Sequence, residues 1–380
     1  YDYKVTVNMN VITATSVTVT ANGTSKTATK NGEVLTFSIP YGTKFTPTVK
    51  FTAKTGKQYN LVWGAQTSNT PSATTAGTAI SGTEVTMGTS GATATVTLTE
   101  LFTVTINLHK NVVTNTTVTA SVWHQTKDFS STSTLQFVVP INKNAFNAQV
   151  WFNTVSGKKY NLIWATTGKA EVTAEQGNGY SVVVNKLITC TSNLTLDVAF
   201  TELFTISAKV NNEKAGTVSL SASIVMNGGS VTATAKANVG YSVNGFSWEP
   251  SSSGTVTSIS NPMTVTNIRG NLTITANFEA ERYSMEFRLK GEPKNEDFFG
   301  FMYYDIETDV TLLGTPTLTG YTFTGWKVYV GGNYWEVGKI YNANQHIGTG
   351  TYGYVQFMAQ WKANSLTFGG ANLNDATFAN

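Results

Sequence analysis

The chain has 380 residues, and its 25 Lys and Arg residues against 22 Asp and Glu residues give a formal net charge of +3. Because this charge is small and forms no long basic run, nucleic acid and anionic membranes are poor candidates as partners. Threonine accounts for 64 residues while charged residues make up 12% of the chain, a composition typical of an all-β protein with threonine on exposed strand faces.

One pattern of strands recurs four times along the chain. The sequence GKQYNLVW at residues 56–63 returns as GKKYNLIW at 157–164, and TELF at 99–102 returns at 201–204. The segments GYSVNGFSW at 240–248 and GYTFTGW at 320–326 repeat the step from Tyr to Trp. Tandem copies of this size are typical of repeat modules, so the pattern favours a repeat protein over an enzyme.

Each copy opens and closes on a strand with apolar residues at every second position. The opening residues are Val5, Val7, Met9; Val104, Ile106, Leu108; Ile206, Ala208, Val210; and Met285, Phe287, Leu289. The closing residues are Ala94, Val96, Leu98; Leu194, Leu196, Val198, Phe200; Leu272, Ile274, Ala276, Phe278; and Val355, Phe357, Ala359, Trp361. This alternation places one face of each strand in a core, so we expect the first and last strands of a copy to pair or share a sheet.

The middle strand of each copy supplies aromatic residues to the expected core. These residues are Tyr59, Trp63, Tyr160, Trp164, Tyr241, Trp248, Tyr321 and Trp326, with Trp361 from the closing strand of the fourth copy. In the third and fourth copies a glycine breaks the alternation, at Gly245 and Gly325. An extra residue at a glycine predicts a β-bulge at both positions.

The repeat divides the chain into four small β domains: copy 1 at residues 1–100, copy 2 at 101–202, copy 3 at 203–281 and copy 4 at 282–363. Residues 364–380 are expected to form a C-terminal tail or an extra strand. The junctions contain no Gly/Ser-rich linker, so we expect the four domains to form an elongated, semi-rigid rod. Charged residues are concentrated at the start of copy 4, with nine between 281 and 300, so its role is expected to differ.

The fourth copy resembles a known family of repeats. The segments PTLTGYTFTGW at 316–326 and FMAQW at 357–361 match the pattern of the Listeria-Bacteroides repeat, the B-repeat of internalin-type surface proteins, over residues 283–363. Copy 3 resembles the divergent form of this repeat. The resemblance implies a strand-rich, β-grasp-like module that occurs in tandem in exported bacterial proteins and some phage structural proteins, as stalk or adhesive segments. For copies 1 and 2 an immunoglobulin-like sandwich is the competing expectation.

The sequence offers little material for catalysis. His109, His124 and His346 lie in distant segments and not at metal-ligand spacing, so we expect no metal site, no cofactor and no catalytic residue. Cys190 is the only cysteine, and beside Leu187 and Ile188 it is expected to act as a small buried hydrophobe. The acidic residues between Glu296 and Asp309 are interpreted as a solvated edge, with a loop cation site as the alternative.

A few aromatic residues lie outside the repeated core pattern and are the candidates for contact with a ligand or partner. Trp335 lies near Tyr329 and Tyr334 in a Gly-rich hairpin of copy 4, where stacking on a sugar ring or on an apolar patch is one possibility and cross-strand packing the other. Trp123, next to His124, is the fourth candidate.

These observations predict a non-enzymatic, extracellular structural or adhesive repeat protein of a bacterial cell surface. One alternative is a phage fibre, decoration or filament subunit that self-assembles, which would place the chain on a virion, and another is an array of glycan-binding modules. The expected partners are a host-surface protein, a glycan or copies of the chain itself, with the C-terminal tail as a route to a homo-oligomer. No apolar stretch approaches the length of about 18 residues that a membrane span needs, so no membrane insertion is expected.

Overall fold

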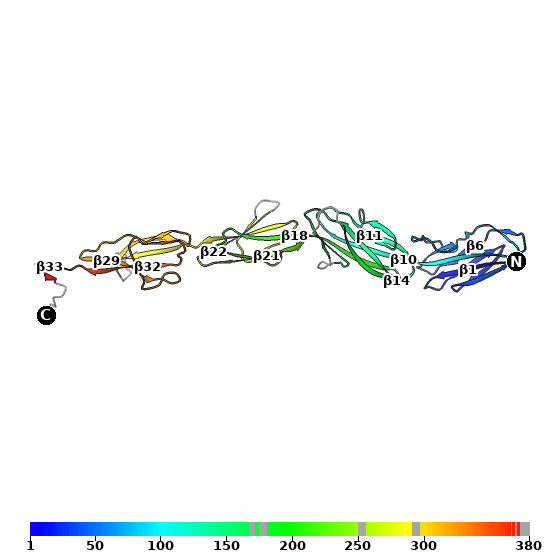
Figure 1. Cartoon of the computed structure of the whole chain (residues 1–380), viewed down its shortest axis with the longest axis horizontal. Coiled ribbons are helices and arrows are strands. Elements are labelled where there is room, and N and C mark those ends of the chain that lie inside the picture. Colours follow the sequence, from blue (N-terminus) through cyan, green and yellow to red (C-terminus); the bar gives the residue numbers. More distant parts are fainter. Residues whose placement is uncertain are drawn as a thin grey trace. The chain divides into compact units, whose positions relative to one another are not determined.

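The structure is a computed structural model that describes residues 1–166, 172–174, 181–249, 256–290, 297–365, 367–368 and 371–372. The chain divides into two compact units, unit 1 at Tyr1–Phe204 and unit 2 at Thr205–Asn380. Both units consist of strands and connecting loops, and the described residues contain no α-helix (Figure 1). The expectation of an all-β fold is therefore confirmed.

Copy 1 is a sandwich of two four-stranded sheets. The first sheet contains, in order, β4 (Glu33–Ser38), β1 (Asp2–Asn10), β10 (Ala92–Asn111) and β7 (Gln58–Trp63). The second contains β3 (Thr24–Ala28), β2 (Ser16–Ala21), β6 (Thr48–Thr52) and β8 (Ile80–Ser81), and β5 (Lys44–Phe45) pairs separately with β9 (Val85–Thr86). Alternate residues from both sheets, such as Val5 and Val19, bury their side chains in one core between them.

Copy 2 repeats the order of both four-stranded sheets. Its first sheet contains β13 (Thr134–Pro140), β10, β18 (Leu194–Val210) and β15 (Lys159–Ile163), which also pairs with β16 (Val172–Ala174). Its second sheet contains β12 (Gln125–Asp128), β11 (Val118–Val122), β14 (Asn142–Asn153) and β17 (Ser181–Cys190). For both copies the structure favours the sandwich over the β-grasp alternative.

Strand β10 belongs to both sandwiches of unit 1. Its first half pairs with β1 and β7, and its second half pairs with β13 and β18. Residues 96–102 are buried without alternation, because both faces of the strand are covered where one copy ends and the next begins. The junction at Thr99 and Glu100 therefore lies inside a continuous strand.

Unit 2 contains the strands of copies 3 and 4 and a short terminal hairpin. Copy 3 has β19 (Gly216–Leu220), β20 (Ile224–Met226), β21 (Val231–Ala237), β22 (Tyr241–Glu249), β23 (Val256–Ser258), β24 (Met263–Val265) and β25 (Leu272–Ala280). Copy 4 has β26 (Tyr283–Arg288), β27 (Phe298–Tyr304), β28 (Val310–Thr311), β29 (Tyr321–Val330), β30 (Ile340–Tyr341), β31 (His346–Gly348) and β32 (Val355–Ala363). β33 (Thr367–Phe368) pairs with β34 (Ala371–Asn372), and apart from residues 364–365 the rest of the expected tail lies outside the described residues.

Two small sheets form each copy in unit 2. In copy 3, β23, β22 and β25 pair in that order, and β25 also pairs with the last residues of β18. β19, β21 and β24 form a second sheet. In copy 4, one five-stranded sheet has the order β27, β26, β32, β29 and β30, and β28 pairs with β31. The core of copy 4 lies on one face of the larger sheet, around Phe287, Trp326, Trp335 and Phe357.

The first and last strands pair in parallel in all four copies, which confirms the expectation from their matching apolar faces. β1 pairs with β10, β10 with β18, β18 with β25, and β26 with β32. The two predicted bulges are also confirmed. The β22–β25 ladder shifts register between Val243 and Phe246, and the β29–β32 ladder shifts between Phe323 and Gly325. Gly245 has φ +99°, which favours glycine, and a Cβ there would lie 2.2 Å from the carbonyl oxygen of Ser258.

The repeated aromatic residues do not all have the same burial. Tyr59, Tyr160, Tyr241 and Trp326 are buried, and Trp63, Trp164, Trp248 and Trp361 are partly buried. Tyr321 differs from the expectation because 47% of its surface is exposed. It is the first residue of β29 and lies opposite Ala363, the last residue of β32, so the ladder extends there beyond the core of copy 4.

Candidate functional site

Trp335 is a core residue, and this corrects its interpretation as a contact residue. Its side chain is 1% exposed, and the indole Nε1 donates a hydrogen bond to the hydroxyl of Tyr304 at 2.7 Å. The ring also lies against Tyr341 and Phe357, with centroid distances of 5.7 and 5.4 Å. The Gly-rich hairpin folds back over the inner face of the sheet, so no ligand can reach this ring without unfolding the hairpin.

The other candidate aromatics of this hairpin lie at the surface. Tyr329 and Tyr334 are both exposed, and the ring of Tyr334 is 6.0 Å from that of Tyr352. The structure therefore separates the three candidates of copy 4. Trp335 holds the hairpin to the core, while the two tyrosines are available to a partner.

Trp123 lies in a tight turn between β11 and β12. It has φ +47° and His124 has φ +63°, backbone conformations that are unfavourable for residues other than Gly, Asn and Asp. The same turn of copy 1 carries Asn22 and Gly23, with φ +43° and +74°, the residue types that such turns prefer. Trp123 is partly buried and packs against Phe146 at a centroid distance of 5.1 Å, so its packing holds a strained turn in place.

An exposed row of aromatic residues on β27 was missed by the sequence analysis. β27 is the edge strand of the copy 4 sheet, and Phe298, Phe301 and Tyr303 are exposed. Phe301 and Tyr303 pair with Glu286 and Ser284, whose side chains lie on the face opposite the core. The phenylalanine and tyrosine rings are 5.2 Å apart, and together these three residues are called the aromatic row. The alternation of Phe301 and Tyr303 with the inward-facing Met302 and Tyr304 was the signal in the sequence that could have found it.

Polar side chains lie beside the aromatic row on the same face of the sheet. Arg288 donates to Glu286 at 3.1 Å and Gln356 donates to the same carboxylate oxygen at 3.3 Å. The guanidinium of Arg282 lies 3.8 Å from the centroid of the Tyr303 ring, within the range of a cation–π interaction. The face therefore combines flat apolar rings with a charge-balanced hydrogen-bonding network.

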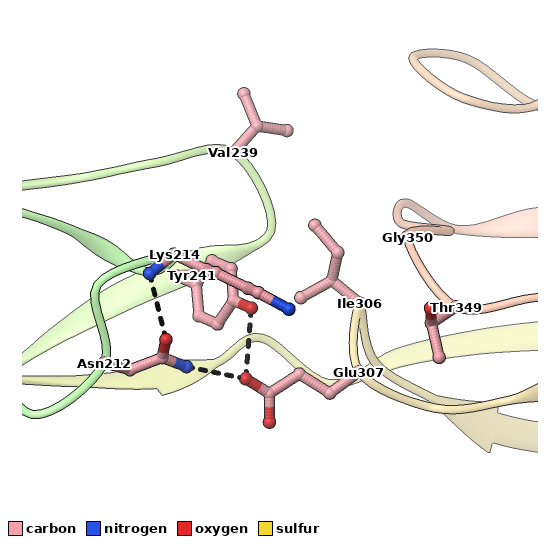
Figure 2. A pocket seen from close by; sticks show the side chains of 8 residues that line it. All are labelled: Asn212, Lys214, Val239, Tyr241, Ile306, Glu307, Thr349 and Gly350. Carbon is pink, nitrogen blue, oxygen red and sulfur yellow. Dashed lines mark hydrogen bonds between the residues drawn. The ribbon is translucent and has the colours of Figure 1, made fainter.

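Unit 2 also contains a hollow of about 540 Å³ between copies 3 and 4. Figure 2 shows Glu307, from the loop after β27, reaching toward Asn212 and Tyr241. One oxygen of the Glu307 carboxylate accepts hydrogen bonds from the Asn212 amide at 2.8 Å and from the Tyr241 hydroxyl at 3.0 Å. Burial raises the pKa of Tyr241, and the hydrogen bond and charge of Glu307 raise it further. These bonds attach the loop after β27 to copy 3, so the arrangement holds the two copies together and does not resemble a ligand site.

A fully buried carboxylate lies at the junction of copies 1 and 2. Glu100, in β10, accepts hydrogen bonds from the main-chain N–H groups of Ile12 and Thr13 at 2.9 Å each and from the Thr13 hydroxyl at 2.9 Å. The Nζ of Lys57 lies 3.4 Å from the same carboxylate. Because β1 ends at Asn10, the side chain of Glu100 holds the chain just beyond the end of that strand.

Copy 2 repeats this buried carboxylate. Glu202 accepts hydrogen bonds from the main-chain N–H groups of Val113 and Thr114 and from the Thr114 hydroxyl, and Lys158 lies 3.5 Å away. Burial raises the pKa of Glu202, but the hydrogen bonds from Thr114 and Val113 and the charge of Lys158 outweigh it, so the pKa lies below its ordinary value. The recurrence of Lys and Glu at matching positions of the first two copies was the signal in the sequence.

The remaining titratable candidates are dispersed. His109 contacts Asp197 at 2.9 Å, and His346 contacts Asp309 at 3.4 Å, both at the surface. Cys190 is buried, as expected, and burial raises the pKa of its thiol to about 11. Asp297 is buried near Lys290, whereas Glu296 lies outside the described residues. Within the described part of the chain, no three His, Cys, Asp or Glu side chains come together as metal ligands would. No described helix has the length and apolar character of a membrane span.

One family of protein domains matches part of the chain. Residues 206–282 match the divergent InlB B-repeat domain. This match falls on copy 3, where the sequence resembles the divergent form of the repeat. The resemblance of copy 4 to the typical B-repeat stays a prediction. No curated protein matches the sequence.

Several solved structures resemble the chain weakly. The SpaC pilus adhesin from Lactobacillus rhamnosus GG is 13% identical, with a TM-score of 0.29 over 74% of this chain and 43% of the adhesin. The TIE protein of Bacillus anthracis is 10% identical, with a TM-score of 0.29 over 93% of this chain and 69% of that protein. A putative polysaccharide-binding protein from Bacteroides thetaiotaomicron is 9% identical, with a TM-score of 0.18 over 40% and 75% of the two chains. These TM-scores are too low to support a functional argument.

Proposed function

We propose that this chain is a non-enzymatic structural and adhesive segment of an extracellular, cell-surface protein, in which copies 1 to 3 act as a stalk and copy 4 makes contact. The observation that carries the proposal is the fourfold recurrence of one arrangement, a parallel pair of first and last strands over a core, along a single chain. Repetition of a scaffold multiplies length and surface, which suits a spacer better than a catalyst. The match of residues 206–282 to the divergent B-repeat domain supports the same conclusion.

The aromatic row of copy 4 is the proposed contact surface. Half-exposed rings beside a network of Glu286, Arg288 and Gln356 offer apolar contact and hydrogen bonds together. Sugar rings present apolar C–H faces bordered by hydroxyl groups, and protein hot spots are rich in Tyr and Arg, so a surface glycan or a protein patch suits this face. Tyr329 and Tyr334 are secondary contacts in the proposal.

Location and contact need separate tests. Antibodies raised against the purified chain are expected to label intact, unpermeabilised cells of the source organism, and labelling only after lysis would contradict the surface location. Binding of the purified chain to a glycan array and to immobilised host-surface extract is expected to fall at least tenfold in Phe301→Ala/Tyr303→Ala. The exposed Tyr41 of copy 1 provides the matched control, because Tyr41→Ala is expected to bind normally.

Self-assembly into a filament or fibre is the outcome that would replace the stalk proposal. Sedimentation of the purified chain across a hundredfold range of concentration distinguishes the two. A monomer at all concentrations agrees with a stalk, whereas concentration-dependent polymers favour a structural subunit. The elongated rod expected from the short junctions also stays a prediction, and solution scattering tests it.

A further inference from the structure

The strand pairing determines how each copy responds to tension along the chain. Where the first and last strands of a copy are parallel neighbours, pulling the chain by its two ends slides one strand along the other. All hydrogen bonds between the two strands then share the load at once. Where the two loaded ends belong to antiparallel neighbours, the same pull breaks the bonds one after another. Forced unfolding depends on the unfolding barrier, so the two geometries differ in mechanical strength even when the fold is equally stable.

The parallel ladders are longest in the first two copies. β1 and β10 pair over eight positions, from Tyr3 opposite Ala92 to Asn10 opposite Thr99. β10 and β18 also pair over eight positions, from Val104 opposite Leu194 to Asn111 opposite Thr201. The ladder of copy 3 covers five positions and that of copy 4 covers four. In copies 1 and 2, therefore, the largest number of hydrogen bonds between the first and last strands bears the pulling force.

In the first three copies, side-chain hydrogen bonds reinforce the ladder at the C-terminal end of the first strand, called here the far end. In copies 1 and 2, the carboxylates of Glu100 and Glu202 hold the main chain just beyond the first strand. In copy 3, the Asn211 side chain both accepts from the N–H of Phe278 at 2.9 Å and donates to its carbonyl oxygen at 2.8 Å. Sliding the first strand would break these bonds together with the ladder.

Two further contacts, in copies 2 and 3, reinforce the opposite end of the ladder, where the pairing of the first and last strands begins. The Asn193 side chain accepts from the N–H of Thr103 at 3.0 Å, and Asn271 accepts from the N–H of Thr205 at 2.9 Å. In copy 1 the corresponding position is Gly91, where a Cβ would lie 2.5 Å from the carbonyl oxygen of Asp2. The glycine lets the two main chains approach directly. The parallel ladders of copies 2 and 3 are thus held by side-chain hydrogen bonds at both ends.

Load passes from copy 1 to copy 2 without a linker. β10 is the last strand of copy 1 and the first strand of copy 2, and the same strand is sheared against β1 in one half and against β18 in the other. Tension therefore passes from copy 1 to copy 2 through β10, which is paired along both of its halves.

From these observations we propose that the four copies are shear clamps that carry tension along the chain, and that copies 1 and 2 are the strongest. The proposal deepens the stalk function and rests on it for its biological meaning. A stalk between a cell and a contact surface would be under tension whenever the two are pulled apart, and shear loading keeps its copies folded under that force.

Single-molecule pulling of the intact chain tests the ranking of the copies. Pulled by its two ends, the chain is expected to unfold first in two steps of roughly 250 Å and then, at higher force, in two steps of roughly 320 Å, since an extended residue spans about 3.3–3.6 Å. The shorter steps correspond to copies 3 and 4 and the longer ones to copies 1 and 2. Longer steps at the lower force would overturn the ranking.

A change of pulling direction tests the clamp itself. β1 and β4 are antiparallel, and Tyr1 donates to the carbonyl oxygen of Ile39 at their adjacent ends. Pulling between the N-terminus and a thiol at the exposed position 41, in Tyr41→Cys, unzips β1 instead of shearing it. We expect the first rupture force in this direction to be lower by roughly twofold or more than that of the 320 Å steps, because few ladder bonds are loaded at a time. Equal forces in the two directions would overturn the proposal.

The buried carboxylates provide a matched set of variants. Glu100→Gln and Glu202→Gln place an amide donor against main-chain donors, and each is expected to lower the force of one 320 Å step while leaving the other unchanged. Glu84→Gln, at an exposed position of copy 1, is the control and is expected to leave all four steps unchanged. If a glutamine variant fails to fold, the comparison of rupture forces in the two pulling directions still tests the shear-clamp proposal. Low shear forces would overturn the clamp but leave the surface location intact, because antibody labelling tests that independently.

Discussion

Glu202 and Thr114 are joined by two hydrogen bonds of 2.8 Å, one from the main-chain N–H of Thr114 and one from its hydroxyl, to a carboxylate with no exposed surface. These bonds keep the pKa of Glu202 below its ordinary value of 4.5 despite burial, which acts in the opposite direction. A carboxyl group whose folded pKa is lowered stabilises the fold fully above its unfolded value, and this contribution disappears as pH falls through the folded pKa.

Glu202→Gln is therefore expected to lower the free energy of unfolding of unit 1 by about 1–3 kcal/mol at pH 7, because buried donors lose a charged acceptor. The deficit should shrink as pH falls below 4.5 and passes through the lowered pKa of the natural side chain. Urea unfolding from pH 7 to pH 3 measures both effects, with Glu84→Gln as the control. A deficit independent of pH would contradict the explanation.

The turn at Trp123 and His124 provides a test of backbone strain. His124 is exposed and has φ +63°, so His124→Gly is expected to raise the free energy of unfolding by about 1 kcal/mol. The reciprocal change in copy 1, Gly23→Ala at φ +74°, should lower it by about 1 kcal/mol. Denaturant midpoints measure both. Equal midpoints for the two variants would show that the turn is not strained.

The bulge at Gly245 is expected to tolerate no side chain. Gly245→Ala would place Cβ against the main chain of Ser258 in an unfavourable φ region, and we expect a loss of about 2–3 kcal/mol. Gly270, also in copy 3, has no atom within 4 Å of the Cβ position, so Gly270→Ala is the control and should stay within about 0.5 kcal/mol of the natural chain. Thermal unfolding of both variants decides the question.

Trp335 is expected to affect stability, whereas Tyr329 is not. Trp335→Ala removes a buried ring and its bond to Tyr304, which should cost about 3–5 kcal/mol and unfold copy 4 at a lower temperature. Tyr329→Ala at the surface should leave the melting temperature nearly unchanged. Circular dichroism of both variants would also show whether any loss of binding in Trp335→Ala comes from unfolding.

The thiol of Cys190 is expected to react only after unfolding. Burial raises its pKa to about 11, so at pH 8 both the exposure and the thiolate fraction are low. Alkylation by iodoacetamide should be at least a hundredfold slower in the native chain than in urea. Rapid labelling of the native chain would mean that β17 opens readily.

Strand alternation in the sequence was sufficient to predict the first, middle and last strands of each copy, that the first and last strands pair or share a sheet, and both bulges. The bulges were predictable because Gly245 and Gly325 interrupt a strict alternation, and an interrupted alternation has one common structural solution. The sequence left both contact and packing open for Trp335, because its hairpin has no alternation and the fold of a Gly-rich loop over a core depends on distant residues such as Phe357.

The buried carboxylates could not be predicted from local pattern. Glu100 follows a threonine in a strand, which reads as a solvent-exposed position, and its burial results from β10 being covered on both faces. Its partners at Ile12 and Thr13 are nearly 90 residues away, and the parallel pairing of β1 with β10 brings them together. The aromatic row, in contrast, does show a local signal, because Phe301 and Tyr303 alternate with the more buried Met302 and Tyr304.

The double role of β10 bears on how such an array can grow. A gene duplication whose ends both fall inside this strand yields a new repeat that begins and ends with half of such a strand. The half-strand at its start joins the sheet of the preceding copy, and the half-strand at its end can join the sheet of a following copy. Each added copy thus inherits its own connector, and the array can lengthen by whole repeats without a separately evolved hinge.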